Sequence, residues 1–203
     1  THLDHIRGVG TAARKFSVPV SMHEQLSHSN IVKNGRPEII PVKPGNTYSV
    51  GNFTYTPFIT SHDAPYSMSY VITVWEDSGC KKFVIVTDTG EISREIKELL
   101  NDAEVLFLEA NYDIQSLLDG PYPLFLKRRI SSKLGHLSND DAVELLQSIQ
   151  DKGNNNLKKI FLCHLSDITN NPVFVLKACE YLINSGMDIT VCSKGGIYSA
   201  ELT

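Results

Sequence analysis

Apolar and polar positions alternate along much of the chain, or apolar residues gather in short runs, and both patterns predict β-strands. Several of these segments are bounded by glycine, proline, asparagine or serine, which favour turns. The predicted strands are Pro19–Met22, Thr47–Val50, Phe53–Ile59, Met68–Val74, Phe83–Thr87, Val105–Leu108, Ile160–Leu162, Ile189–Cys192 and Ile197–Leu202.

Other segments repeat their apolar residues every three or four positions, which predicts helices. These helices are Ile6–Phe16, Ile92–Leu100, Asp140–Gln150 and Val173–Asn184. Ser138 is placed to cap the third helix with Asp141 near its third position, and Gly186 is a stop signal after the last. The apolar stripe of the third helix is Ala142, Leu145, Leu146 and Ile149.

The order of the elements is a helix, a run of antiparallel-looking strands, and then alternating helices and strands. This order predicts a layered α/β architecture with a sheet between helices. No linker divides the chain, so we expect residues 1–203 to form a single domain. Asn154–Asn156 is expected to be a surface turn, and Lys194-Gly195-Gly196 a tight turn between two strands.

Composition narrows the class of protein. The chain has 203 residues, 41% hydrophobic and 21% charged, which is typical of an ordinary globular protein. Its formal net charge is -4, so any nucleic-acid binding must use a local basic patch. No apolar run reaches the roughly 18 residues of a membrane span. The four cysteines form no CxxC pair, which favours reduced thiols in the cytoplasm, or in the nucleus of a eukaryote.

Side chains that bind metals crowd the start of the chain. His2, Asp4 and His5 lie within one short turn just before a predicted helix. Imidazole and carboxylate groups at this spacing can face two neighbouring metal ions. On these residues alone, a polar segment that caps a helix explains the pattern as well as a metal site does.

Three later residues favour the metal site. His62, Asp88 and His164 each follow a predicted strand, where a rigid sheet usually carries its functional groups. A lone histidine at such a place is most often structural, but three sites together with the opening cluster indicate a common centre. His23 and His28 lie outside every motif and are expected to be structural or on the surface.

A short basic run, Lys127 to Arg129, precedes Gly135-His136. A phosphate backbone can rest on Arg128 and Arg129, although most charge runs are only solvated faces. The helix start at Ser138 and Asn139 can receive an anion on its backbone amides, which the neighbouring acidic residues oppose. Tyr112 and Tyr122 can stack on bases, and packing is the more ordinary role of both.

Together these motifs resemble those of the metallo-β-lactamase superfamily. His2-Leu3-Asp4-His5 looks like the latter part of its HxHxDH signature, and the later ligands resemble its three following motifs in the right order. Agreement with the YycJ (WalJ)-like branch is carried by Ser61-His62-Asp63-Ala64, Thr87-Asp88-Thr89-Gly90, Glu109-Ala110-Asn111-Tyr112-Asp113, Arg128-Arg129-Ile130, Gly135-His136-Leu137-Ser138-Asn139, and His164-Leu165-Ser166 with Asn170-Asn171.

The resemblance implies a four-layer αββα sandwich with two metal ions, zinc or manganese, at the sheet edges. The signature's first histidine would fall immediately before Thr1, so we expect an N-terminally incomplete domain that lacks the opening strands of the family. The implied ligands are His2 and His62 for one metal, Asp4, His5 and His164 for the other, and Asp88 between them.

The resemblance also implies a nuclease-like function, with a DNA exonuclease role. Glu109 and His136 resemble a Glu–His pair of related tRNA-processing nucleases, in which the carboxylate orients the imidazole. His136 would then donate a proton to the leaving alkoxide, and Asp4 would orient the nucleophile besides binding metal. The simpler alternative is that His136 caps a helix and Glu109 is merely polar.

The expected function is therefore a metal-dependent phosphodiesterase or nuclease that acts on DNA or RNA through activated water. A metal-bound hydroxide also attacks carbonyl groups, so a small-molecule ester, thioester or β-lactam hydrolase stays open. The incomplete opening motif keeps a third possibility, a binding protein without activity.

Overall fold

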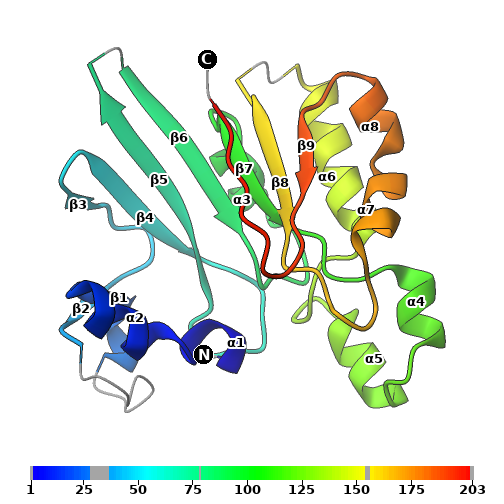
Figure 1. Ribbon diagram of the computed structural model, residues 1–203, viewed down its shortest axis with the longest axis horizontal. Coiled ribbons are helices and arrows are strands. Elements are labelled where there is room, and N and C mark those ends of the chain that lie inside the picture. Colours follow the sequence, from blue (N-terminus) through cyan, green and yellow to red (C-terminus); the bar gives the residue numbers. More distant parts are fainter. Residues whose placement is uncertain (1, 28–36, 78, 154–155, 202–203) are drawn as a thin grey trace.

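The computed structural model describes residues 2–27, 37–77, 79–153 and 156–201 (Figure 1). The strands are β1 (Val20–His23), β2 (Ile39–Val42), β3 (Tyr48–Val50), β4 (Phe53–Ile59), β5 (Met68–Glu76), β6 (Gly79–Val86), β7 (Val105–Glu109), β8 (Lys159–Cys163) and β9 (Ile189–Val191). The helices are α1 (Leu3–Ile6), α2 (Val9–Phe16), η1 (Glu24–Leu26), α3 (Arg94–Leu99), α4 (Ile114–Asp119), α5 (Leu124–Ile130), α6 (Asn139–Asp151), α7 (Pro172–Ala178) and α8 (Glu180–Asn184).

Strands β3 to β9 form one mixed sheet in sequence order. The pairs from β3 to β6 are antiparallel, and the pairs from β6 to β9 are parallel. Neighbouring parallel strands must be joined by a crossover connection. Helix α3 joins β6 to β7, helices α4 to α6 join β7 to β8, and helices α7 and α8 join β8 to β9. Consequently the carboxyl ends of β6, β7 and β8 lie side by side at one edge of the sheet.

The helices α3, α6, α7 and α8 cover one face of this sheet and form the core with it (Figure 1). The predicted stripe of the third helix is buried against the strands, and its predicted Ser138–Asp141 capping box is present. Core residues that join strand and helix layers include Val84, Val86, Leu106, Leu108, Leu146, Ile160, Leu162, Val175 and Leu182.

The mixed α/β fold is confirmed. Of the four expected layers, the described residues show the large sheet and the helix layer that covers it. Strands β1 and β2 form a separate two-stranded parallel sheet. Figure 1 places α1 and the α4–α5 pair at the same end of the large sheet.

Two strand predictions differ from the structure. Strand β2 was not predicted because it is short and contains Pro41, which is tolerated here in a pair without further neighbours. The predicted strand Ile197–Leu202 is wrong over its described residues, which are irregular. Ile197 is 98% exposed, and the Tyr198 hydroxyl accepts from the backbone N–H of Ser193, so the segment closes on itself instead of pairing.

The helices also differ in detail. The first predicted helix breaks at Arg7-Gly8, and the last divides at Cys179. Helices α4 and α5 were not predicted, because they bury too few residues to give a periodic apolar pattern. Only Leu117 of α4 is buried, and in α5, which the structure describes throughout, no residue is.

Three further predictions concern individual surface residues, a turn near the end of the chain, and membrane-spanning helices. His28 and Asn154-Asn155 lie outside the described residues. Residues 194–196 do form a turn, but no strand follows it in the described part of the chain. Within the described residues, no helix is both long and apolar enough to pass through a membrane.

Candidate metal centre

The residues predicted from strand ends converge at the shared edge of the sheet. Glu109 ends β7 opposite Cys163 of β8, Asp88 follows β6, and His164 follows β8. Asp88 and His164 both have left-handed backbones, with φ of 52° and 58°. Such conformations cost energy outside glycine and are found mostly where function requires them.

Glu109 holds several residues of this edge in place through hydrogen bonds. Its side chain is fully buried and accepts hydrogen bonds from the backbone N–H groups of Asp88 and Leu137, both at 2.8 Å. It also accepts from Nδ1 of His164 at 2.7 Å and from Nδ1 of His136 at 3.2 Å. Because a carboxylate only accepts, both rings must carry their proton on Nδ1. Nε2 of each neutral ring is then left with a lone pair.

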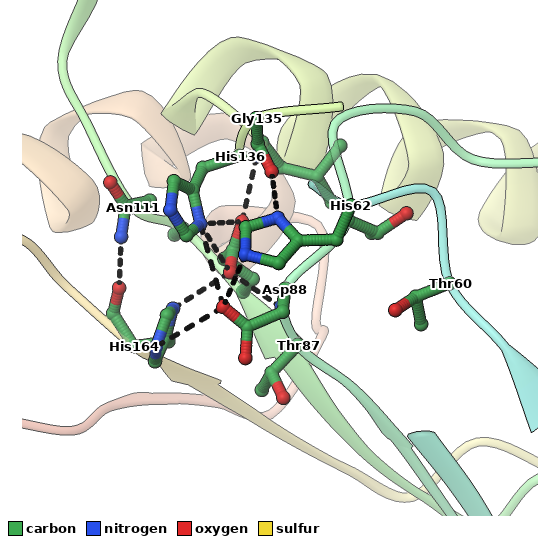
Figure 2. A network of polar contacts seen from close by, with 12 residues as sticks. Thr60, His62, Thr87, Asp88, Asn111, Gly135, His136 and His164 are labelled. Carbon is green, nitrogen blue, oxygen red and sulfur yellow. Dashed lines mark hydrogen bonds and ion pairs between the residues drawn. The ribbon is translucent and has the colours of Figure 1, made fainter. Parts of the chain in front are cut away.

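His62 has the side chain whose surroundings best fit the binding of a cation. Its Nδ1 donates to the carbonyl of Gly135 at 2.8 Å, so the lone pair of the neutral ring is on Nε2 (Figure 2). Nε2 is buried and has no hydrogen-bond partner among the described residues. Burial also lowers the pKa of His62, which keeps the ring neutral. A buried imidazole lone pair without a donor costs free energy, and a bound metal ion would remove that cost.

The residues of α1 complete the cluster. His5 Nε2 lies 2.6 Å from Asp88 Oδ2 and 3.4 Å from Asp4 Oδ2, while His164 Nε2 lies 3.5 Å from Asp4 Oδ2. Asp88 presents its other oxygen to His62 Nε2, 3.4 Å away. Figure 2 shows His62, His136 and His164 arranged around Asp88. The carboxylate of Asp88 thus lies between two groups of ligands.

Three groups of side chains have ligand atoms within 4.8 Å of one another. They share an edge of the sheet, and two of them match the two-metal division implied by the family resemblance. The groups are His2, His62 and Asp63; Asp4, His5 and His164; and Asp88, Glu109, His136 and His164.

The cluster is electrostatically balanced between acids and imidazoles. Burial raises the pKa of Asp88, but the His5 hydrogen bond and nearby histidines outweigh it and hold the value at about 2. Burial lowers the pKa of His164, but the hydrogen bond and charge of Glu109 raise it further, to about 9. The hydrogen bond that His5 donates to Asp88 raises the pKa of His5. The raised pKa values of His5 and His164 mean that protons on these two rings supply the positive charge that faces Asp88 and Glu109.

A cleft of about 360 Å³ opens over these ligands. Arg129 lines it, and Arg128 is exposed one position earlier on α5. Asp63 also lines the cleft. The sequence pattern assigns no role to Asp63, and only its position next to His62 pointed to one. The lining residues are His2, Asp4, His62, Asp63, Asp88, Arg129, Ile130, Gly135 and His136.

The backbone amides at the start of α6 are not free to bind an anion, contrary to the prediction. The Ser138 backbone N–H donates to Asp141, and that of Asn139 donates to Tyr112. Both side chains are buried, with Ser138 in the capping box and Asn139 bonded to Asn170. The expected anion on these amides is therefore wrong for both residues, because the protein already uses their donors.

Of the remaining candidates, Tyr112 is 5% exposed and packs, as its ordinary role predicts. His23 is also buried, where its Nδ1 accepts from the backbone of Gln25 and its ring stacks on Tyr66. The expectation of a structural role for His23 is confirmed.

Known proteins resemble this chain in sequence. A family described as the beta-lactamase superfamily domain matches residues 1–162. Exodeoxyribonuclease WalJ of Streptococcus pneumoniae is 36% identical over 176 residues, which are 83% of this chain and 62% of that protein. Exodeoxyribonuclease YycJ of Bacillus anthracis is 33% identical over 178 residues, 84% of this chain and again 62% of that protein. The chain thus spans 62% of the length of these curated relatives.

Solved structures support the fold. The metallo-β-lactamase fold protein YhfI from Bacillus subtilis superposes with a TM-score of 0.64 at 17% identity, covering 98% of this chain and 73% of that one. A diphosphatase of the PhnP family gives a TM-score of 0.58, also at 17% identity, over 93% of this chain and 64% of that one. At such identities the likeness concerns the fold alone.

Proposed function

This chain belongs to the metallo-β-lactamase superfamily and, within it, to the YycJ (WalJ)-like branch, and from that membership we propose that it is a metal-dependent phosphodiesterase that cuts nucleic acid, DNA in particular. The curated relatives are named exodeoxyribonucleases. Support within this chain comes from the ligand cluster and from the pair of Glu109 and His136 beside it.

We propose two divalent ions, zinc or manganese, because histidine and carboxylate ligands suit both metals. The donor set fits them: His62 has a buried lone pair without a partner, and Asp88 reaches toward both ligand groups. His2 and His62 would hold one ion, and Asp4, His5 and His164 the other. Bound ions of this kind lower the pKa of water and stabilise charge on a phosphoryl oxygen.

The observation that carries a phosphodiesterase is His136. Its Nδ1 is bonded to Glu109, which fixes the ring, and the residue lines the same cleft as the ligands. In phosphodiester hydrolysis a water oxygen forms a bond to phosphorus, and the bond to the leaving oxygen breaks. That alkoxide needs a proton, which His136 is placed to donate from Nε2 when both of its ring nitrogens are protonated, while its Nδ1–H stays on Glu109. Asp4, in reach of both His5 and His164, would orient the attacking water.

A panel of substrates tests the proposal. Intact protein supplied with zinc or manganese should cleave labelled DNA and a generic phosphodiester, with RNA as a further comparison. Hydrolysis of a chromogenic β-lactam alone would contradict a phosphodiesterase and favour a carbonyl hydrolase. Metal binding without cleavage of any of these would favour a binding protein.

We also propose that the protein works in a reducing compartment, the cytoplasm. All four cysteines are free thiols in the structure. Thiols that stay unpaired are typical of reducing compartments, where disulfides are rare.

A further inference from the structure

We infer that the cleft binds a second phosphate of the substrate, adjacent to the reacting one, and that Arg129 is the residue that binds it. The inference rests on the proposed function, because it extends the same cleft to a second charged group. It assigns a substrate that carries two phosphates in preference to an isolated diester.

Arg129 is held at the cleft by one side of its guanidinium. Its Nε donates to Oδ2 of Asp63, in a contact that orients the planar group. The side chain remains 51% exposed, and the residue lines the cleft beside His136. Among the described residues only Nε of Arg129 has a hydrogen-bond partner, so both Nη groups can bind a phosphate, which matches their fork geometry.

Asp63 is itself fixed, so the position of Arg129 is set by the metal cluster. Its backbone N–H donates to the carbonyl of Leu134 at 3.0 Å, and its Oδ1 accepts from His2 Nε2 at 2.9 Å. The same carboxylate orients a proposed metal ligand and the arginine.

Charge also singles out Arg129. Among the described residues that line the cleft, it is the only lysine or arginine, whereas three aspartates face the same space. Of the neighbouring basic side chains, Lys127 donates to the carbonyl of Leu118 and Lys133 pairs with Glu91. Arg128 is exposed and does not line the cleft. Arg129 is therefore the side-chain cation that the described lining of this cleft offers to a second phosphate.

An exposed ion pair by itself contributes little to stability, about 0–1 kcal/mol. The Arg129–Asp63 pair is therefore poorly explained as a means of holding the fold. It is better explained as a device that presents a guanidinium to the substrate.

The kinetic test compares substrates with one and two phosphates. For Arg129→Ala we expect KM to rise about 10- to 100-fold on a dinucleotide with a terminal phosphate or on a trinucleotide without one. On bis-p-nitrophenyl phosphate, which has a single phosphate, the loss of kcat/KM should be much smaller than on either two-phosphate substrate. The two-phosphate substrate that shows the penalty identifies a terminal phosphate or a neighbouring diester as the group bound.

Matched variants separate a specific contact from general charge. Arg94→Ala removes a helical arginine on α3 that is more exposed than Arg129 and lies outside the cleft, and it should leave both activities unchanged. Arg129→Lys keeps the charge without the fork, so it should recover only part of the lost affinity. Thermal unfolding of Arg129→Ala should match that of Arg94→Ala.

Equilibrium binding of a fluorescent single-stranded oligonucleotide tests the inference even if no cleavage is found. Arg129→Ala should weaken binding and reduce the slope of log affinity against log salt by about 0.7. Equal penalties of Arg129→Ala on one- and two-phosphate substrates would overturn the inference, as would binding identical to Arg94→Ala. Failure of the wild-type protein to cleave any diester, with Arg129-dependent binding intact, would overturn only the proposed activity.

Discussion

Four N–H groups converge on the buried carboxylate of Glu109, two from the backbone and two from the rings of His136 and His164. A second polar contact supports the strained backbone of His164, whose carbonyl accepts from Asn111 Nδ2 at 2.8 Å. The ligand residues His62, Asp88 and His164 were predictable from the sequence, because each follows a strand. Asp63 was not, because its partner Arg129 lies 66 positions away and no local pattern links them.

Replacing Glu109 with glutamine tests this arrangement. The amide would place an N–H group opposite other donors, so at least one ring would lose its acceptor. We expect the affinity for zinc to fall about 10- to 100-fold, as for other partners that orient metal-binding histidines. A competition titration with a chelator measures this, with Glu98→Gln on the exposed surface of α3 as the control. Wild-type affinity in Glu109→Gln would contradict the role given to Glu109.

Metal binding should depend on pH through His164. In the metal-free protein burial lowers its pKa, but Glu109 raises it to about 9, so Nε2 carries a proton at neutral pH. A metal ion must displace that proton, and the work of doing so falls as pH rises toward 9. We expect zinc affinity to increase between pH 6.5 and 8.5 by at most about tenfold per unit for this proton. An affinity that is flat over this range would contradict the coupling.

At the scale of elements, the segment between α5 and α6 is pressed against the other loops of the site. The Gly135 carbonyl accepts from His62, and the Leu134 carbonyl from the backbone of Asp63. A Cβ at Gly135 would lie 2.1 Å from the Ile130 carbonyl oxygen. Capping residues made the start of α6 predictable, whereas α4 and α5 escaped prediction because they bury too little to leave an apolar period.

Gly135→Ala should therefore damage both stability and the metal site. Because the clash is with backbone, which cannot turn away, we expect a loss of about 1–3 kcal/mol or more in the free energy of unfolding. Urea unfolding of the metal-free protein measures this loss, and metal content should fall with it. Gly8→Ala is the control, because nothing lies within 4 Å of its Cβ. Equal stability of the two variants would contradict the close packing of this loop.

At the scale of the whole molecule, the site exists because two crossovers, from β6 to β7 and from β7 to β8, bring three strand ends to one edge. The sequence pattern predicted most strands, the layered α/β class and the buried stripe of α6. It did not predict which strands pair, since pairing depends on contacts between distant segments that periodicity does not encode. The irregular end of the chain, with Ile197 exposed, shows the same limit: alternation alone did not decide between a strand and a loop.

Burial of the thiols makes a prediction for the whole fold. Burial raises the pKa of Cys163 to about 12 and that of Cys179 to about 11, and it also raises the pKa of Cys192. Cys80 is exposed. Iodoacetamide at pH 8 should modify Cys80 first in the native protein, and all four cysteines after unfolding, as peptide mass spectrometry would show. Modification of Cys163 as fast as Cys80 would contradict the packing at the end of β8.

The most direct test of the central claim measures phosphodiester cleavage and bound metal together in wild-type protein and His136→Ala. The two proteins should bind the same number of metal ions, because Asp88, His62 and His164 remain in place. Cleavage by the variant should be slower by about 100- to 10,000-fold, the usual contribution of a general acid. Unchanged cleavage at equal metal content, or a parallel loss of metal and activity, would contradict the assignment of His136 as the proton donor beside a metal centre.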